Sequence, residues 1–364
     1  MTPSDNQPAD LPGEAATATA QGAPSGLFKG GTERLHGAPL LEEVGLFLVP
    51  EFPLLSFSAA IDVLRHCNRI TGEKLYRWHV LSGDGGAVIS SAGVSIATDA
   101  AIGAHPDLDF LIVFAGVNAE RYRNREVMTH LQRIARRGCC MGSASAGSFI
   151  LARAGLLNRR RCTVHWEDME CFKETFPHLQ VSNEVFEMDG ARVTCSGGIA
   201  VIDAMLARVS EHHGRTLATQ VADIMMQERI RDSQDLQRMP LPARLGVNHP
   251  KLVQAIEYIE CSQDQPYTQI ELAARVGLSS RQLERLFRRY LDITPSQYAL
   301  RHRLKRARNL LRTTSLGVLQ VAVAAGFSTA SHFTKSYKHF FQLTPSQERR
   351  RRPERGGQAG RISR

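Results

Sequence analysis

The chain has 364 residues, 43% of them hydrophobic, and a formal net charge of +9, which leaves room for two domains of ordinary size, each with its own core. Its seven cysteines are irregularly spaced, so the sequence predicts neither a disulfide framework nor a metal site. It contains no signal-peptide pattern and no apolar stretch long enough to cross a bilayer, and we therefore expect a cytoplasmic protein without membrane contact or cofactor.

The two ends of the chain differ in charge. From Leu241 to the C-terminus there are 22 Lys and Arg residues against 8 Asp and Glu, whereas the first 240 residues have a balance of −5. The basic stretch 349–364 accounts for only part of this difference, because residues 241–348 alone keep a balance of +8. A basic domain joined to a mildly acidic one is typical of nucleic-acid-binding proteins.

Residues 1–41 are rich in Ala, Gly, Pro, Thr and Ser, and we expect this extension to be disordered because few of its side chains are able to form a core. Beyond it, short apolar segments alternate with amphipathic ones up to residue 232. Strands are predicted at 44–50, 76–82 and 109–116, helices at 56–70 and 125–138, and strand–turn–helix units at 139–157 and 194–214. This alternation predicts an α/β domain at 42–232 with a mostly parallel sheet, whose ligands bind at the carboxyl ends of the strands.

The next segment, 233–249, is predicted to be a linker, because the periodicity is lost and prolines are frequent. The pattern that follows is helical throughout and predicts an all-α domain at 250–347. A basic tail at 348–364 is expected to end the chain.

The helical region contains an internal repeat. Residues 271–298 match residues 320–347, with an offset of 49 residues at first and of 50 after one insertion. The matching positions are Ala273 with Ala322, Gly277 with Gly326, Phe287 with Tyr337, and Thr294–Gln297 with Thr344–Gln347. A small residue where two helices cross, followed four residues later by a glycine that turns the chain through positive φ, is typical of a helix-turn-helix. Two matched copies in the basic part of the chain therefore predict two such units.

The second helix of each unit is predicted to contact DNA, since its apolar side chains face inward and its polar ones outward. The candidate DNA contacts are Ser279, Ser280, Arg281, Glu284, Arg285 and Arg288 in the first unit, and Ser328, Thr329, Ser331, His332, Thr334 and Lys335 in the second. Arg pairs with guanine, and the smaller polar side chains bond to bases or phosphates. A helix at 295–314 joins the units, and we expect it to set them about one DNA turn, ~34 Å, apart.

This region resembles the DNA-binding domain of the AraC/XylS family. The resemblance covers residues 250–347, and the segment GFSTASHFTKSYKHFFQLTPSQ is especially similar to that family's second unit. It implies a transcriptional regulator that binds double-stranded promoter DNA, commonly as a homodimer, and usually activates transcription, with RNA polymerase as a further partner.

A strand-to-helix turn in the first domain has the pattern of a nucleophile elbow, with Ser145 at its centre. His165 is a candidate base, and the backbone N–H groups of Gly116 and Ala146 are candidate oxyanion donors. Both residues also have an interpretation without catalysis. A sharp turn tolerates only a small residue at the position of Ser145, and His165 is a candidate for an ordinary core histidine. A hydrolase or amidotransferase activity of the first domain is therefore one hypothesis that these residues support.

Residues 44–230 resemble the class I glutamine-amidotransferase-like domain of the PfpI/ThiJ superfamily, which is fused to an AraC-type domain in the GlxA-like regulators. The resemblance implies a flavodoxin-like, amidotransferase-like α/β fold. Enzymes of that superfamily have Cys at the elbow and an acidic residue after the first strand. This chain has Ser145 at the elbow and, by the same resemblance, Ser56 at the acidic position, with Glu51 nearby. Both departures predict that the domain is not an enzyme, since a His without an orienting carboxylate is a poor base. The former active site is then expected to bind an effector.

Three segments resemble regulators that respond to arginine, glycine betaine or carnitine: FSAAIDVLRHCNRITGEKLYRW, ARAGLLNRRRCTVHWED and TCSGGIA. This resemblance implies a small zwitterionic nitrogen compound as effector. Backbone N–H groups of the elbow and of the turn at 196–198 are candidate partners for its carboxylate, and the rings of Trp166, Phe52 or Trp78 for its cationic head. The candidate ligand-binding residues are Phe52, Gly116, Ser145, Ala146, His165, Trp166, Ser196 and Gly197. A third hypothesis gives the first domain a role only in dimerisation, through the helix at 125–137.

Overall fold

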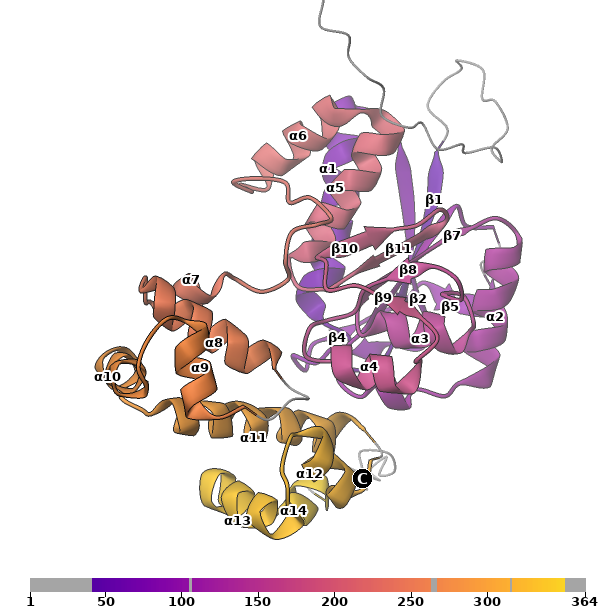
Figure 1. The fold of residues 1–364 in the computed structure, drawn as a ribbon. Helices are drawn as coiled ribbons and strands as arrows, with labels where there is room; N and C mark the ends of the chain where they lie inside the picture. The colour runs from indigo at the N-terminus through magenta and orange to yellow at the C-terminus, as the bar shows by residue number, and fades with distance from the viewer. Residues whose placement is uncertain (1–40, 105–106, 263–266, 315, 351–364) are drawn as a thin grey trace, which may run out of the picture. The chain divides into compact units, whose positions relative to one another are not determined.

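The computed structural model describes residues 41–104, 107–262, 267–314 and 316–350. Nearly all of the extension 1–41, which the sequence predicts to be disordered, and most of the tail predicted at 348–364 lie outside these residues. The described residues form an α/β domain followed by a region built of helices (Figure 1), which confirms the predicted fold class. None of the described helices is both long and apolar enough to span a bilayer.

A seven-stranded sheet forms the centre of the first domain, with the strand order β10-β11-β7-β6-β1-β2-β5. Its strands are β1 (Glu42–Leu48), β2 (Tyr76–Ser82), β5 (Ala100–Ala101), β6 (Phe110–Ala115), β7 (Cys140–Ser145), β10 (Phe186–Met188) and β11 (Arg192–Cys195). Every neighbouring pair is parallel except β10 and β11. Strands β1 and β6 are buried along almost their whole length, as is usual for parallel strands covered by helices on both faces.

Helices cover both faces of this sheet (Figure 1). They are α1 (Leu54–Thr71), α2 (Arg125–Arg136), α3 (Gly147–Arg153), α4 (Met169–Thr175), α5 (Ala200–His213) and α6 (Arg215–Ile224), with the short 3-10 helices η1 (Ile102–Ala104) and η2 (Ala119–Arg121). Helices α1, α5 and α6 pack on one face and α2, α3 and α4 on the other, so each face has its own hydrophobic core. Two short strand pairs lie outside the sheet, β3 (Val88–Ile89) with β4 (Ser95–Ile96) and β8 (Arg161–Cys162) with β9 (Gln180–Val181).

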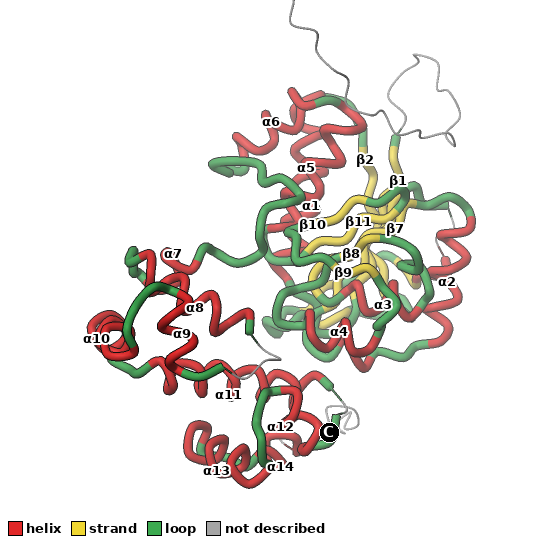
Figure 2. The backbone as a smooth tube through the Cα atoms, viewed as in Figure 1, coloured by secondary structure: helices red, strands yellow, loops and turns green. Residues whose placement is uncertain are grey.

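The described residues after 240 form helices joined by loops (Figure 2). The helices are α7 (Leu241–Leu245), α8 (Pro250–Cys261), α9 (Gln269–Arg275), α10 (Ser280–Leu291), α11 (Pro295–Thr313), α12 (Val318–Ala324), α13 (Ala330–Phe341) and α14 (Pro345–Arg350). They enclose two separate cores, one that contains Phe287 and one that contains Phe333. Each half of the predicted repeat therefore has a core of its own.

Residues 231–237, which include the start of the predicted linker, lie against the first domain. Arg231 bonds to Asp203 of α5 through both its backbone N–H and its side chain. Leu236 forms a β-bridge with Glu184, which lies between β9 and β10. This part of the linker is therefore attached to the α/β domain.

Candidate DNA-binding interface and ligand site

The first helix-turn-helix unit consists of α9 and α10, which meet at a turn. Ala273 of α9 and Phe287 of α10 are buried in one core, and Gly277 has a φ of +64°, as the sequence pattern predicts. Ser279 caps α10 by accepting a hydrogen bond from the backbone N–H of Gln282, whose side chain accepts one from the N–H of Ser279 in return. The cap starts α10 directly after the turn. The face of α10 opposite the buried Phe287 is exposed.

Charged side chains occupy that exposed face of α10. Arg281 and Arg285 are exposed, lie one turn apart on the same side of the helix, and have no hydrogen-bond or ion-pair partner among the described residues. Arg288 instead pairs with Glu284, with 3.2 Å between Arg288 Nε and Glu284 Oε1. Arg281 and Arg285 are therefore free to pair with bases or phosphates.

The second unit, α12 and α13, repeats this arrangement. Ala322 and Phe333 are buried, Gly326 has a φ of +76°, and Thr329 caps α13 by accepting a hydrogen bond from the backbone N–H of His332. Of the residues predicted to contact DNA here, Ser328, Thr329, Ser331, His332 and Lys335 are exposed and Thr334 is half-buried. Polar groups thus cover the outer face of α13, with Lys335 the one lysine among the predicted contacts.

The Thr-Pro-Ser-Gln sequence that occurs in both repeats begins a helix each time. In α11 the Thr294 hydroxyl accepts from the backbone N–H of Gln297, and the Gln297 side chain accepts from the N–H of Thr294. The same pair of bonds joins Thr344 and Gln347 at α14. Proline suits the first helical position, where its missing N–H leaves no bond unmade. The repeat is thus explained as a helix start rather than as a DNA contact.

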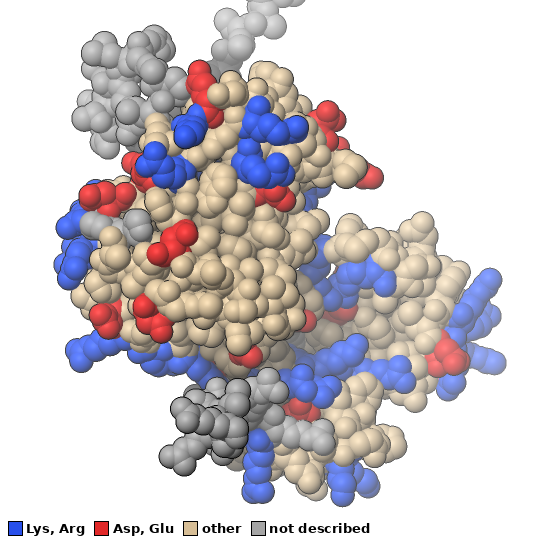
Figure 3. Space-filling model, turned by 180° about the vertical axis from the view of Figure 1, so that it is seen from behind, with Lys and Arg blue, Asp and Glu red and all other residues tan. Residues whose placement is uncertain are grey.

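Helix α11 contacts α8 and α10 of the first half and α12, α13 and α14 of the second. Glu348 of α14 is only 2% exposed and pairs with Arg308 and Arg312 of α11, at 3.2 and 2.6 Å. Residues 348–350, which the sequence assigns to the tail, therefore belong to the folded helical region. Basic side chains outnumber acidic ones over this region in the space-filling view (Figure 3).

In the first domain, Ser145 lies at a sharp turn between β7 and α3, with a φ of +59°. The turn is tightly packed, because a Cβ at Gly147 would lie 2.2 Å from the carbonyl oxygen of Val113 and a Cβ at Gly197 would lie 2.6 Å from Ser145 Cβ. Such strained backbone is typical of functional turns and persists only where the surroundings hold it. The elbow geometry predicted for this segment is therefore present, with a serine at its tip.

The elbow borders a hollow, which we call the ligand hollow. Within the first domain it is lined by Pro53, Ser91, Gly116, Val117, Asn118, Glu120, Ser145, His165, Glu167 and Asp168. Three of the predicted ligand-binding residues, Gly116, Ser145 and His165, thus come together. The sequence-based prediction missed three lining residues, Asn118, Glu120 and Asp168. Asn118 and Glu120 follow β6 closely, and this position could have indicated them, since ligands of parallel sheets bind beyond the strand ends.

Two of the backbone donors expected to bind a ligand's carboxylate are already engaged. The N–H of Ala146 donates to Ala115 O at 3.0 Å and that of Ser196 to Val185 O at 2.9 Å. The backbone of Gly197 acts on the Cys195 thiol. Burial raises the pKa of this thiol to about 12, and a backbone hydrogen bond from Gly197 lowers it in part. This corrects the expectation for Ala146 and Ser196. Their N–H groups extend the pairing of β6 with β7 and of β10 with β11.

The aromatic side chains suggested for a cationic head are also placed differently from the prediction. Phe52 is fully buried, and its ring packs edge-on against Phe57 with the centroids 5.5 Å apart. Trp78 packs against the core from β2. Trp166 is 42% exposed, but the guanidinium of Arg238 lies 4.4 Å from its ring centroid. In this structure no pair of these rings forms a cage around the ligand hollow.

His165 has one nitrogen occupied, and no carboxylate accepts a hydrogen bond from its ring among the described residues. Its Nδ1 accepts a hydrogen bond from the backbone N–H of Glu167 at 3.3 Å, while Glu167 Oε2 lies 4.0 Å away. Burial lowers the pKa of His165, so its neutral form is favoured, and the proton then lies on Nε2. Ser56, at the position where the related enzymes have an acid, donates to Gly198 O at 3.3 Å. The base and orienting acid of a catalytic triad are therefore not assembled.

On the side of the first domain, the ligand hollow is bordered by the carboxyl groups of Glu120, Glu167 and Asp168. Burial raises the pKa of Asp168 to about 7, and the charges of Glu120 and Glu167 raise it further in the same direction. Among the described residues no group of His, Cys, Asp and Glu is arranged to hold a metal ion. Where these carboxyl groups are ionised, they are able to pair with a cationic organic group.

Comparison with known proteins covers both domains. A family model described as "Helix-turn-helix domain" matches residues 272–351, and the DJ-1/PfpI family model matches residues 42–211. The HTH-type transcriptional regulator GbdR of Pseudomonas aeruginosa is 42% identical over 312 residues, which cover 86% of this chain and 85% of that protein. CdhR of the same species is 44% identical over 308 residues, covering 85% and 91%. GlxA of Rhizobium meliloti is 34% identical over 312 residues, covering 85% and 96%.

Matches of this extent decide the family. The chain is an HTH-type transcriptional regulator of the family that joins a DJ-1/PfpI domain to an AraC-type helix-turn-helix domain. This confirms the resemblance of residues 250–347 to the AraC/XylS domain and that of residues 44–230 to the PfpI/ThiJ domain, and with them DNA binding and transcription regulation as the function of the chain. Its DJ-1/PfpI domain keeps the strained elbow but has Ser145 at the tip.

Proposed function

We propose that this regulator binds promoter DNA as a cytoplasmic homodimer, with α10 and α13 in successive major grooves, and activates transcription together with RNA polymerase. The observation that carries the proposal is the pair of helix-turn-helix units, each with a buried apolar face and an exposed polar one. Helix α11, which contacts both, has 19 residues and is therefore about 28 Å long. This length suits the ~34 Å that separate successive grooves along one face of DNA.

Selection of DNA from a random-sequence pool by the full chain tests this function. Each protomer is expected to enrich two sequence elements whose centres lie about 10 base pairs apart, and footprinting is expected to show both protected. A selected site placed upstream of a promoter should raise transcription by purified RNA polymerase. Enrichment of no sequence, or of a single element, would contradict the paired reading by α10 and α13.

The first domain binds the effector, a small nitrogen compound with a cationic group, in the ligand hollow. Ser145 Oγ and His165 Nε2 face no hydrogen-bond partner among the described residues, so both are able to bond to a ligand's oxygen. Asp168, with Glu120 and Glu167, supplies negative charge for the cationic group. The relatives named above support a regulator of this architecture, and the hollow's own residues support the ligand class.

A thermal-shift screen of the full chain tests the ligand class. The compounds are L-arginine, glycine betaine and L-carnitine, since a ligand that binds only the folded state raises the melting temperature. We expect one of them to give a saturable shift that Asp168→Asn and Ser145→Ala reduce. Asp223→Asn, the same change at an exposed position on α6, should leave the shift unaltered. No shift with any of the three compounds would contradict the ligand class.

The same domain has no catalytic function. Its elbow favours a hydrolase as the competing hypothesis, because Ser145 has the strained φ of a nucleophile. His165, however, accepts a hydrogen bond at Nδ1, where a triad histidine donates one to a carboxylate. We expect no ammonia release from glutamine or arginine by the full chain. Release that disappears in Ser145→Ala would instead make the domain an enzyme.

A further inference from the structure

We propose that the linker completes the ligand site, with Gln237 as a positioning residue that holds the segment 163–168 in its ligand-binding conformation. This inference rests on the effector-binding function proposed above. It states how the site is coupled to the chain that leads to the DNA-binding domain. Because the segment carries His165, Glu167 and Asp168 into the ligand hollow, what holds the segment also holds the site.

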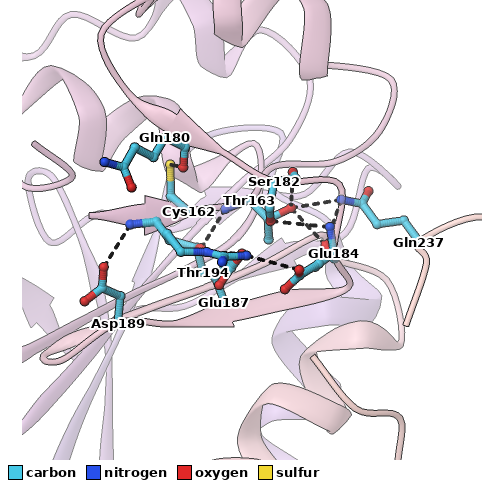
Figure 4. Close-up of polar contacts among 10 residues, drawn as sticks. Cys162, Thr163, Gln180, Ser182, Glu184, Glu187, Asp189, Thr194 and Gln237 are labelled. Carbon is cyan, nitrogen blue, oxygen red and sulfur yellow. Dashed lines mark hydrogen bonds and ion pairs between the residues drawn. The ribbon is translucent and has the colours of Figure 1, made fainter. Parts of the chain in front are cut away.

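The side chain of Gln237 bonds directly to this segment (Figure 4). Its Nε2 lies 2.9 Å from Thr163 Oγ1, 3.0 Å from Val164 O and 3.0 Å from Glu184 O. Two N–H groups thus serve three acceptors, two of them backbone carbonyls. The preceding residues add a backbone attachment, because Asp235 O accepts from the N–H of Val185 at 3.0 Å.

The other side of Thr163 is bonded to the elbow. Its carbonyl oxygen accepts from Ser148 Oγ at 2.6 Å, and Ser148 Oγ lies 2.9 Å from Ser143 Oγ. Its N–H donates to Thr194 Oγ1 of β11 at 2.9 Å. Ser143, Ser148, Thr163 and Thr194 are each at most 2% exposed, so these bonds do not compete with bulk water. Ser143 and Ser148 stand on either side of Ser145, and Thr163 therefore joins the elbow to the linker.

Within the segment 163–168, some residues contact the linker and others line the ligand hollow. Thr163 and Val164 accept from Gln237, and the ring of Trp166 lies under Arg238, the next linker residue. His165 and Asp168 line the ligand hollow, and the N–H of Asp168 donates to His165 O at 2.9 Å. A shift of this short segment toward or away from the linker therefore moves the groups that face the ligand.

This arrangement makes linker attachment and ligand binding one coupled equilibrium. Loss of Gln237 would leave the carbonyl oxygen of Val164 without its donor and would remove the bond that the Thr163 hydroxyl accepts, although this hydroxyl keeps its own bonds to Ser182 O and Glu184 O. The unmade bond at Val164 favours rearrangement of the segment. If the attached linker favours the ligand-binding conformation, a bound ligand favours the attached linker by the same factor. Ligand binding would then change the freedom of the chain that leads to α7 and the DNA-binding helices.

Hydrogen exchange of the full chain tests the coupling without a ligand. In Gln237→Ala we expect exchange at residues 233–238 and at 163–168 to become about tenfold faster, the factor for loss of about one net hydrogen bond. Gln234→Ala is the matched control, because Gln234 lies in the same stretch, is exposed, and has no partner among the described residues. Faster exchange at 233–238 with unchanged exchange at 163–168 would refute the proposal.

Gln237→Glu is a second variant. It is needed because local repacking could compensate for the missing side chain in Gln237→Ala. Its carboxylate would face the carbonyl oxygens of Val164 and Glu184 as an acceptor, so we expect it to release the linker more completely than Gln237→Ala does. Exchange at 163–168 should follow. If both variants leave this segment protected while their melting temperatures match the wild type, Gln237 has no positioning role.

The ligand arm uses whichever of L-arginine, glycine betaine or L-carnitine raises the melting temperature. That compound should slow exchange at 233–238 in the wild type, and its affinity by calorimetry should fall about tenfold in Gln237→Ala. Unchanged affinity in a variant whose linker is released would refute the coupling. If none of the three compounds binds, the proposed ligand class fails, whereas the exchange comparison still decides the role of Gln237.

Discussion

Gly197 approaches the elbow more closely than any side chain would permit, and its replacement by alanine is a direct test of the ligand site. In Gly197→Ala the new Cβ would lie 2.6 Å from Ser145 Cβ and 2.9 Å from Ser145 Cα. Neither atom belongs to a flexible side-chain end, so the elbow itself has to move. The φ of +88° at Gly197 adds a conformational cost, because residues other than glycine seldom adopt positive φ.

The neighbouring glycine separates the two costs. Gly198 has a φ of +59°, and a Cβ there would meet nothing within 4 Å. Gly198→Ala should therefore lose only the conformational part, about 1–2 kcal/mol of the free energy of unfolding. Gly197→Ala should lose this and about 1–3 kcal/mol more for the forced displacement of packed atoms, a total of about 2–5 kcal/mol.

Urea unfolding followed by tryptophan fluorescence measures both variants. The chain has two tryptophans, Trp78 and Trp166, and both lie in the first domain, so the signal reports the unfolding of that domain alone. A thermal-shift titration with the effector compound follows on the folded proteins. We expect Gly198→Ala to keep the shift and Gly197→Ala to lose it, because only the second displaces Ser145.

Two results would refute this reasoning. Equal losses of stability in Gly197→Ala and Gly198→Ala, within about 0.5 kcal/mol, would mean that the elbow yields without cost. A full ligand shift in Gly197→Ala, together with the expected loss of stability, would mean that Ser145 does not border the bound ligand. The first outcome concerns the packing of the elbow and the second concerns the location of the site.

Three further predictions concern charged residues. Arg285→Ala should weaken specific DNA binding by about 1–3 kcal/mol in gel shifts at fixed salt if Arg285 contacts a base, whereas Arg133→Ala, which removes the same charge from α2, should not. Arg208→Met should destabilise the first domain by about 3–5 kcal/mol in urea, since it leaves the buried carboxylate of Glu42, with which Arg208 pairs, without that partner. Binding of a cationic effector, measured by calorimetry, should strengthen as the pH rises through about 7, because the raised pKa of Asp168 keeps its carboxyl partly protonated below that value, and Asp168→Asn should remove this dependence.

Each of these has its own contrary result. A loss of affinity in Arg285→Ala that is the same for specific and random DNA would make Arg285 a phosphate contact. A loss below about 1 kcal/mol in Arg208→Met would mean that Glu42 finds other compensation, for example from His212, which lies 3.6 Å from it. A pH dependence that persists in Asp168→Asn would assign the titration to another group.

The parts of this structure that the sequence predicts well are those whose cause is local. The strands at Glu42–Leu48 and Phe110–Ala115 are continuous apolar runs, and α2 has a strong apolar stripe between charged positions. The helix-turn-helix units repeat a turn glycine and a capping pair within a few residues of each other. In each case neighbouring residues contain the whole physical reason for the element.

The parts that the sequence does not predict depend on distant partners. Strands β8 and β9 have two residues each, too few to show any period, and they exist because they pair with each other. The N–H of Ala146 is a plausible oxyanion donor by its place in the motif, but the register of β6 and β7 commits it to Ala115. Attachment of the linker through Gln237 has no local signal, because its acceptors lie more than 50 residues earlier in the chain.

This difference also separates the two functions proposed for the regulator. The proposed DNA contacts come from single helices, so residue types at helical spacing are enough to name Arg281 and Arg285 as candidates. The ligand hollow is assembled from the ends of several strands, and two of its carboxyl groups, those of Glu120 and Asp168, follow different elements. Loops after strands contribute little to the core, so a change at Glu120 or Asp168 should alter the ligand hollow without altering the DNA-binding helices.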